Sequence, residues 1–296
     1  MAHILGIGTA TVDIINTVAS YPTEDSEIRA IKQRVGRGGN ATNTLVILSQ
    51  LGHHCTWGGV GVNDLDGQFI LAQLADYAID TSSCRLYSQG KMPTSYILLN
   101  QQNGSRTIVH YRDLPEFSFK DFQPINLAKF NWLHFEARQI AETTQMIRQA
   151  KQQYSNLPIS LEVEKPRPQV EQLFTQVDVL LFSKTFAQYH SQMNNAQLFL
   201  HSIHSQAPQA CLICAWGAEG AYALTPTGEL LHSPAFPPAQ VVDTLGAGDV
   251  FNAGIIDGLC RQQQLALALT QACQLAGKKC GQEGLQFIIK PVPQLA

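Results

Sequence analysis

Two glycines and two acids stand close together in the segment VVDTLGAGDVFNAG, residues 241–254. The two valines at its start predict a buried strand, and the apolar residues after Asp249 predict a helix. A glycine-rich turn that enters a helix presents free backbone N–H groups at the positive end of the helix dipole, which suits a phosphate or another anion. Asp249 is then either an ordinary N-cap or a base held beside that anion. Gly246 and Gly248 favour the base, because a cap by itself does not need two glycines.

A second polar cluster lies in GRGGNATN, residues 36–43. Gly39 lets the backbone approach a ligand closely. Asn40 has a structural alternative, as the N-cap of the helix that NATNTLVILSQLG predicts. Asn43 lies three residues further on, near the same face of the first turn, and the N-cap interpretation does not explain it. Two neighbouring amides offer donors and acceptors together, which suits vicinal hydroxyls.

Asp13 lies within TVDII, with apolar neighbours on both sides at the end of the first predicted strand. A buried carboxylate is costly unless it is paired or hydrogen-bonded. Its partner is either a structural group, through a salt bridge or a cap, or a polar ligand, since ligands of open α/β sheets bind at the carboxyl ends of the strands. The residues alone leave these two interpretations equal.

The elements that must position these residues alternate between strand and helix. Apolar runs of strand length include HILGIG, CTWGGVGV, WLHFEA, PISLEVE, DVLLFS and ACLICAW, with helical patterns between them and two more near 249–261 and 265–280. This alternation predicts an α/β domain with a mostly parallel sheet covered on both faces.

Two segments depart from that alternation. TSYILLNQQNGSRTIVHY places two β-rich runs around an Asn-Gly pair, a strong hairpin signal, and DSEIRAIKQRV predicts another strand. We expect a single domain over residues 1–296, with a small projecting β-sheet lid inserted at about 14–36 and 91–112. The tail IIKPVPQLA, residues 288–296, is expected to be loose.

Composition and known motifs exclude several classes. A formal charge of -3 without a basic run argues against nucleic-acid binding, and the pattern of the first residues leads us to expect neither a signal peptide nor a membrane span there. The seven scattered cysteines are then expected to be reduced, in a cytoplasmic protein. The C-x-x-C of Cys211 and Cys214 lies on a predicted strand that turns the two thiols to opposite faces. No Walker-type P-loop is present, and neither GIGTAT nor GAGDVF completes a dinucleotide fingerprint, so a dehydrogenase is only weakly supported.

The segments GRGGNATNTLVILSQLG and DTLGAGDVFNAG resemble the two signatures of the ribokinase-like (PfkB-type) carbohydrate kinases, and the resemblance extends from about residue 4 to 285. It implies a three-layer sandwich and ATP-dependent transfer of a phosphoryl group to a sugar hydroxyl. Asp249 would be the general base, and the turn beside it the anion hole. The residues implied for that hole are Gly246, Ala247 and Gly248, and those implied for the sugar are Asp13, Gly39, Asn40 and Asn43.

The same resemblance implies a nucleotide site and its ions. Arg106 on the hairpin, with Glu164 and Lys165, would lie near the phosphates and metal, and Mg²⁺ is expected with ATP, held largely by phosphates and water. Asp243 and Thr244 match positions that hold a monovalent cation such as K⁺ in many relatives. The remaining nucleotide-binding residues implied are Gly217, Ala218, Glu219, Gly220 and Cys280. Ala218 stands where the relatives specific for ketohexoses carry an acid.

Several stretches, among them EVEKPR, CAWGAEGA and CQLAGKKCG, resemble the members of the family that phosphorylate ketohexoses. This favours fructose as the substrate and its 1-phosphate as the product. Ribose, nucleoside and 2-keto-3-deoxygluconate kinases, and a non-catalytic sugar-binding regulator, remain alternatives. The resemblance also implies a homodimer clasped through the lid, in which Asp25 of one subunit reaches the sugar of the other.

Overall fold

The structure is a computed structural model that describes residues 1–102, 104–192 and 194–287. The tail predicted to be loose, 288–296, lies outside the described residues. Among the described residues, no helix combines the length and the apolar character that crossing a bilayer would require.

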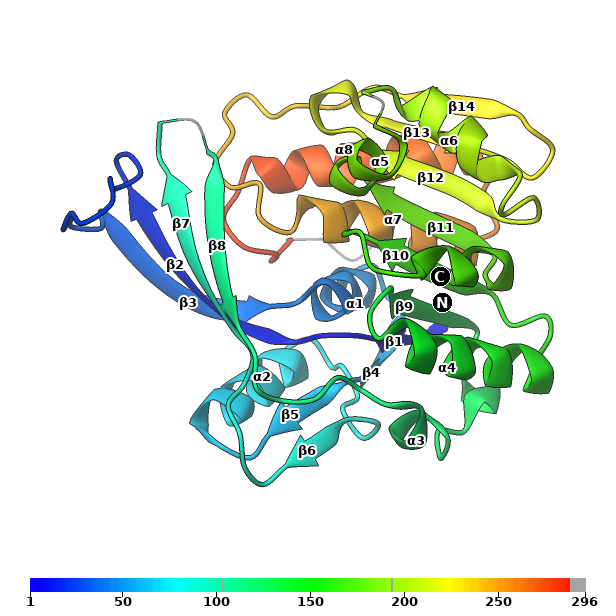
Figure 1. Cartoon of the computed structure of the whole chain (residues 1–296), viewed down its shortest axis with the longest axis horizontal. Helices are drawn as coiled ribbons and strands as arrows, with labels where there is room; N and C mark the ends of the chain where they lie inside the picture. The colour runs from blue at the N-terminus through cyan, green and yellow to red at the C-terminus, as the bar shows by residue number, and fades with distance from the viewer. Residues whose placement is uncertain (103, 193, 288–296) are drawn as a thin grey trace, which may run out of the picture.

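An eight-stranded sheet runs through the middle of the molecule (Figure 1). Its strands are β1 His3–Ile7, β4 His54–Gly58, β9 Trp132–Glu136, β10 Ile159–Val163, β11 Val179–Ser183, β12 Cys211–Ala215, β13 Ala221–Leu224 and β14 Leu230–Ser233. Their order is β14-β13-β12-β11-β10-β9-β1-β4. Every neighbouring pair from β12 to β4 is parallel, and only β13 is reversed, since it pairs antiparallel with both β12 and β14. The mostly parallel sheet that the apolar runs predict is therefore confirmed.

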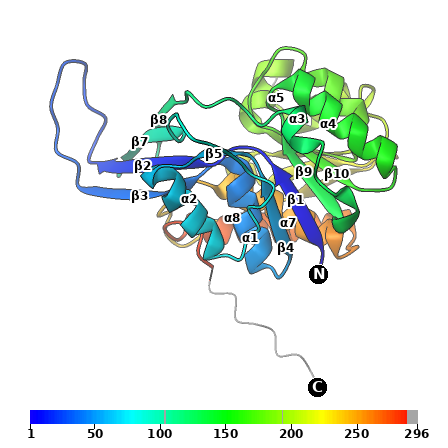
Figure 2. The same ribbon diagram turned by 90° about the horizontal axis from the view of Figure 1, so that it is seen from below.

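Helices cover both faces of this sheet, as Figure 2 shows. The α-helices are α1 Asn40–Gln50, α2 Leu65–Ala75, α3 Phe119–Phe122, α4 Ile140–Gln153, α5 Lys184–Ser191, α6 Ala196–His204, α7 Ala247–Cys260 and α8 Leu265–Cys280. The short 3₁₀ helices are η1 Leu127–Lys129, η2 Val170–Gln176 and η3 Gly217–Glu219. Helices α1, α7 and α8 lie on one face, and α3 to α6 on the other. The three-layer sandwich is thus confirmed.

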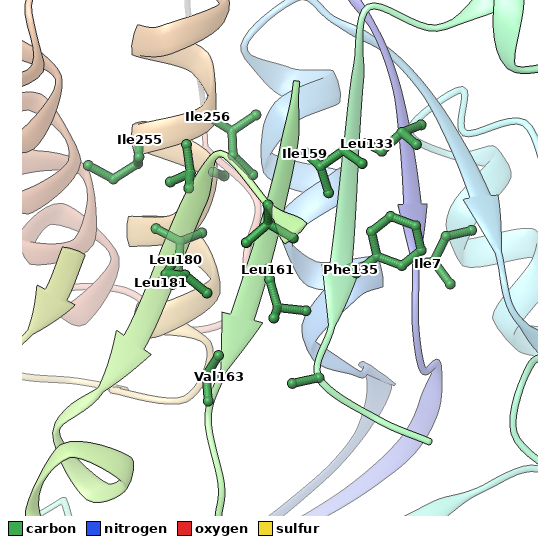
Figure 3. Packing of buried hydrophobic residues seen from close by; sticks show 14 of the residues in the cluster. Ile7, Leu133, Phe135, Ile159, Leu161, Val163, Leu180, Leu181, Ile255 and Ile256 are labelled. Carbon is green, nitrogen blue, oxygen red and sulfur yellow. The ribbon is translucent and has the colours of Figure 1, made fainter. Parts of the chain in front are cut away.

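The core forms where strand side chains meet helix side chains. Leu161 of β10 and Leu180 of β11 are fully buried, as is Ile256 of α7 (Figure 3). Each such side chain contributes about 1.5–3 kcal/mol through removal of apolar surface from water. Strands buried on both faces hold their carboxyl ends at fixed positions, and the ends of β9 and β10 carry Glu136 and Glu162, described below.

A second sheet of four strands projects from the main body (Figure 1). It contains β2 Thr11–Val18, β3 Lys32–Gly38, β7 Thr94–Asn100 and β8 Arg106–Tyr111, in the order β3-β2-β7-β8. Strands β7 and β8 form the predicted antiparallel hairpin. A short pair, β5 Val60–Val62 and β6 Arg85–Tyr87, forms a third sheet. The small sheet expected beside the main one is therefore present.

The structure corrects four local predictions. The strand expected over DSEIRAIKQRV begins only at Lys32 and continues to Gly38, and CTWGGVGV divides into β4 and β5 in different sheets. Asp13 belongs to β2 of the small sheet rather than to the end of the first strand. The two valines before the glycine turn form no strand. Val241 is 54% exposed and Val242 is 42% exposed, so β-branched residues there lie in an open loop.

Candidate active site

A cavity of about 610 Å³ lies between the carboxyl ends of the main strands and the small sheet. Loops after β1, β9, β10, β11 and β12 form one side, and side chains of β2, β7 and β8 form the other. It brings together most of the residues that the sequence singles out. Those that line it are Asp13, Gly39, Asn40, Asn43, Arg106, Glu164, Lys165, Gly217, Thr244, Gly246, Gly248 and Asp249.

Asp249 is the third residue of α7 and is buried, with 7% of its surface exposed. The N-cap of α7 is Gly246, in a left-handed conformation with φ of 81°, so the N-cap interpretation of Asp249 is wrong. Asn43 Nδ2 donates a hydrogen bond of 2.7 Å to Asp249 Oδ2. Burial raises the pKa of Asp249 well above its usual range, and the nearby Glu164 and Glu136 carboxylates raise it further, against the lowering by Asn43. A carboxylate in such surroundings is a stronger proton acceptor.

The first turn of α7 is open toward the cavity. The first N–H groups of a helix have no acceptor within the helix, and they carry the positive end of its dipole. A Cβ added to Gly248 would meet nothing within 4 Å, so space for a ligand lies against this backbone. Ala247 does not line the cavity, and its N–H donates to the Thr244 carbonyl at 3.2 Å. The backbone of Gly246 and Gly248 therefore borders the cavity at the positive end of the α7 dipole.

The two asparagines lie three residues apart at the start of α1, and their side chains contact different partners. The N-cap of this helix is Gly39, with φ of 101°, where a Cβ would collide with the Thr9 carbonyl oxygen. Asn40 is therefore not the cap, and its Nδ2 donates to Glu162 Oε1 at 3.1 Å and Glu164 Oε2 at 3.2 Å. Asn43 turns the other way, toward Asp249.

Asp13 is 8% exposed and accepts a hydrogen bond of 2.7 Å from Thr11 Oγ1. Among the described residues, none forms an ion pair with Asp13, so the structure does not show the salt bridge that was one interpretation of this residue. Burial raises the pKa of Asp13, and the Thr11 hydrogen bond lowers it. Gly38 on the neighbouring strand leaves room for the carboxylate, because a Cβ there would collide with it. Asp13 therefore faces the cavity with hydrogen-bonding capacity to spare.

The site also contains charged groups that the sequence did not reveal. Glu136 ends β9 and accepts backbone hydrogen bonds from Thr9 at 2.9 Å and Ala41 at 2.7 Å. Glu162 is nearly buried, and its Oε2 has no partner among the described residues. Arg37 donates to Asn43 Oδ1 at 2.8 Å. An acid near the end of an otherwise apolar strand, as in WLHFE and ISLEV, is the signal that could have identified the two glutamates.

Residues implied for the nucleotide divide into two groups. Arg106 Nη1 donates to Thr244 Oγ1 at 3.2 Å, which places the hairpin beside the glycine turn. Gly217 lines the cavity, and a Cβ added to it would meet no atom within 4 Å, as at Gly248. The other residues implied for the nucleotide do not line the cavity; they are Ala218, Glu219, Gly220 and Cys280. Asp25, implied for the sugar, and Asp243, implied for a monovalent cation, do not line it either.

The metal-ligating side chains and the thiols are the remaining candidates for chemistry. Across the described residues, no three His, Cys, Asp or Glu side chains gather as a metal cage. All seven cysteines are free, and burial raises the pKa of Cys211 and Cys214, which suits inert thiols. The structural interpretation of the C-x-x-C is the one that the structure supports.

Comparison with known proteins gives the family. Residues 1–291 match the model of the pfkB family carbohydrate kinases. The chain is 42% identical to ketohexokinase from Mus musculus over 295 residues, which covers 97% of this chain and 99% of the mouse protein. It is 24% identical to fructosamine kinase FrlD from Bacillus subtilis, over 83% of this chain and 84% of FrlD.

Solved structures share the fold at lower identity. Ribokinase from Giardia lamblia superposes with a TM-score of 0.85 at 17% identity, over 96% of both chains. Arabidopsis thaliana ribokinase, solved with ribose and ATP, superposes with a TM-score of 0.78 at 17% identity, over 96% of this chain and 94% of that one. The signatures at residues 36–43 and 241–254, the layered fold and these matches agree, and the chain belongs to the PfkB family of carbohydrate kinases.

Proposed function

We propose that this kinase transfers the γ-phosphoryl group of ATP to the C1 hydroxyl of a ketohexose, with fructose as the preferred substrate. The observation that carries the proposal is 42% identity to mouse ketohexokinase over nearly the full length of both chains. The cavity supports it, because a buried acid lies beside an open helix N-terminus. Phosphoryl transfer needs such positioning and charge stabilisation more than covalent chemistry.

In this mechanism Asp249 accepts the proton of the attacking sugar hydroxyl. Its raised pKa suits the role, and the hydrogen bond from Asn43 fixes the orientation of the carboxylate. The N–H groups at Gly246 and Gly248 stabilise negative charge as it develops on the transferred group. ATP, bound as its magnesium complex, supplies the phosphoryl group.

The chain offers matching groups for that complex. The open space at Gly248 and Gly217 would accept phosphate oxygens, and Arg106 would pair with their charge. Glu162 and Glu164 would face a magnesium ion, directly or through water, since hard cations prefer oxygen ligands. The unpartnered Oε2 of Glu162 is the observation that favours a cation there.

On the sugar side, Asp13, Asn40 and Asn43, with the backbone at Gly39, would bind hydroxyls. Carboxylate and amide groups together accept from and donate to neighbouring hydroxyls. Asp13 lies on the small sheet, whereas both asparagines lie on α1 of the main body. The sugar would therefore bind between the two parts of the molecule.

Asp13→Ala is expected to weaken sugar binding and to leave ATP binding unchanged. Loss of one charged hydrogen-bonding partner costs about 1.5–3 kcal/mol, or roughly 10- to 100-fold in affinity. Calorimetric titration with the sugar measures this directly, and the melting temperature reports on folding. An unchanged sugar affinity would show that Asp13 is structural.

We also propose that two subunits clasp through the small sheet. Its surface carries exposed apolar side chains at Val35, Tyr96, Val109 and Tyr111. Such a patch on an open sheet is typical of a protein interface. Asp25 lies exposed in the connection between β2 and β3, away from the cavity of its own subunit, which agrees with a role in the partner's site.

Asp25→Ala is expected to lower sugar affinity while ATP affinity stays constant, because only the sugar pocket of the partner loses a group. Its neighbour Glu24, also exposed, provides the matched control as Glu24→Ala. Sedimentation gives the oligomeric state. A monomer with full activity would refute the clasp.

The proposal is tested by measuring ADP release from Mg·ATP across fructose, tagatose, ribose, adenosine, fructose 6-phosphate and 2-keto-3-deoxygluconate. Preferential turnover of fructose to the 1-phosphate supports the ketohexose assignment. Preferential turnover of another compound in the panel would support the same mechanism with a different substrate. Binding of a sugar without turnover of any member would favour the non-catalytic regulator.

A further inference from the structure

Lys279 in the last turn of α8 is a lysine whose side chain is fully buried. Lysine is almost never buried completely unless its charge is paired, because the ammonium loses its hydration. Its neighbour Lys278 is exposed. The burial therefore belongs to this one side chain and needs a local explanation.

The ammonium of Lys279 is surrounded by oxygen atoms. It donates hydrogen bonds to the carbonyl oxygens of Asp243 at 2.7 Å and Gln282 at 3.3 Å, and it lies 3.3 Å from Asp243 Oδ2. Three oxygen partners match the three donors of an ammonium. Burial lowers the pKa of Lys279, and the Asp243 carboxylate opposes that effect.

These oxygens belong to the segment that leads into the anion hole. Asp243 Oδ1 accepts a hydrogen bond from the Leu245 N–H at 2.8 Å, directly before Gly246. Asp243 Oδ2 also accepts from Arg34 at 2.8 Å. Asp243 is buried and does not line the cavity, whereas the next residues along the turn do. The positive charge thus lies beneath the turn, on the side away from the ligand.

Asp243 and Thr244 were expected to hold a monovalent cation at this place. The residues present do not fit a free ion, since the carbonyl and Oδ2 of Asp243 already face the ammonium and its Oδ1 already accepts from the Leu245 N–H. A second cation among the same oxygens would be repelled by the first.

We propose that Lys279 is a built-in cation that positions the anion-hole turn, so that this kinase works without potassium. The inference rests on the proposed role of Gly246 and Gly248 in holding phosphate. Lys279 acts through Asp243 and is a positioning residue, which touches neither substrate.

The test compares the unmodified protein, Lys279→Ala and the control Lys278→Ala in potassium, ammonium and tetramethylammonium chloride at equal ionic strength. The unmodified protein and the control should show the same turnover in all three salts. The turnover of Lys279→Ala should fall roughly 10- to 100-fold in tetramethylammonium, because small displacements of the turn misplace the reacting groups. Its turnover should recover in potassium or ammonium. Tetramethylammonium is too large to enter the space that the side chain leaves.

A second readout needs no substrate. The melting temperature of Lys279→Ala should rise by about 2–4 °C in potassium or ammonium relative to tetramethylammonium, whereas that of the unmodified protein should not change. A potassium requirement in the unmodified protein would overturn the inference, even if the variant failed to fold. So would a folded Lys279→Ala that is indifferent to the salt in both readouts. Failure of the proposed sugar specificity would leave the melting experiment interpretable.

Discussion

Asp249→Asn is expected to lower the rate of phosphoryl transfer by roughly 10²–10⁴-fold and to leave sugar affinity nearly unchanged. An amide has the shape of the carboxylate and can still accept the hydrogen bond that Asn43 donates at 2.7 Å. It cannot take a proton from the attacking hydroxyl. The variant should therefore bind both substrates and stall before chemistry. Single-turnover measurement of product, alongside calorimetric sugar binding, separates the two effects.

Asp257→Asn is the matched control on the same helix. Asp257 pairs with His53 and Arg261, each at 2.7 Å, and lies outside the cavity lining. The same chemical change there should leave turnover near normal. Near-normal turnover in Asp249→Asn itself would remove Asp249 from the role of base, whatever the control shows.

Gly248→Ala is expected to abolish most activity without destabilising the fold. The added methyl group meets no atom of the protein within 4 Å, and alanine favours a helix more than glycine does, so the melting temperature should stay or rise. The methyl group instead enters the space where a phosphate would lie against the N–H groups. We expect a loss of about 10²–10³-fold in turnover, comparable to the loss of one anion-hole donor.

The converse variant is Gly254→Ala, six residues further along the same helix. There the added Cβ would lie 2.7 Å from Ala272 Cα, so helices α7 and α8 must separate and stability should fall. Gly248→Ala should lower turnover without lowering the melting temperature, whereas Gly254→Ala should lower the melting temperature. This difference would distinguish space that a ligand fills from space that the packing of two helices fills. Full activity in Gly248→Ala would mean that no phosphate lies against this turn.

Prediction from sequence succeeded where the signal is local. The apolar periodicity of 265–280 predicted the helix that the structure shows over Leu265–Cys280. The Asn-Gly hairpin signal and the two glycine segments likewise depend on neighbouring residues. The valines at 241–242 misled because β-branching favours a strand only where a partner strand exists, and this loop has none.

The parts of the site that the sequence did not reveal depend on distant contacts. Glu136 is held by the backbone of Thr9 and Ala41, 127 and 95 positions away, and Glu162 is held by Asn40, 122 positions away. Lys279 carries no mark in the sequence that separates it from Lys278. Only the folded chain shows that one of these lysines is enclosed and the other is exposed.

The hydrogen bond between Asn43 and Asp249 joins residues 206 positions apart. Contacts of such high sequence separation form late in folding, because closing a long loop costs entropy before any contact repays it. The proposed base, Asp249, and the amide of Asn43 therefore come together only when α1 and α7 have docked. A partly folded chain, or one still emerging from the ribosome, has a glycine turn and an aspartate but no catalytic site.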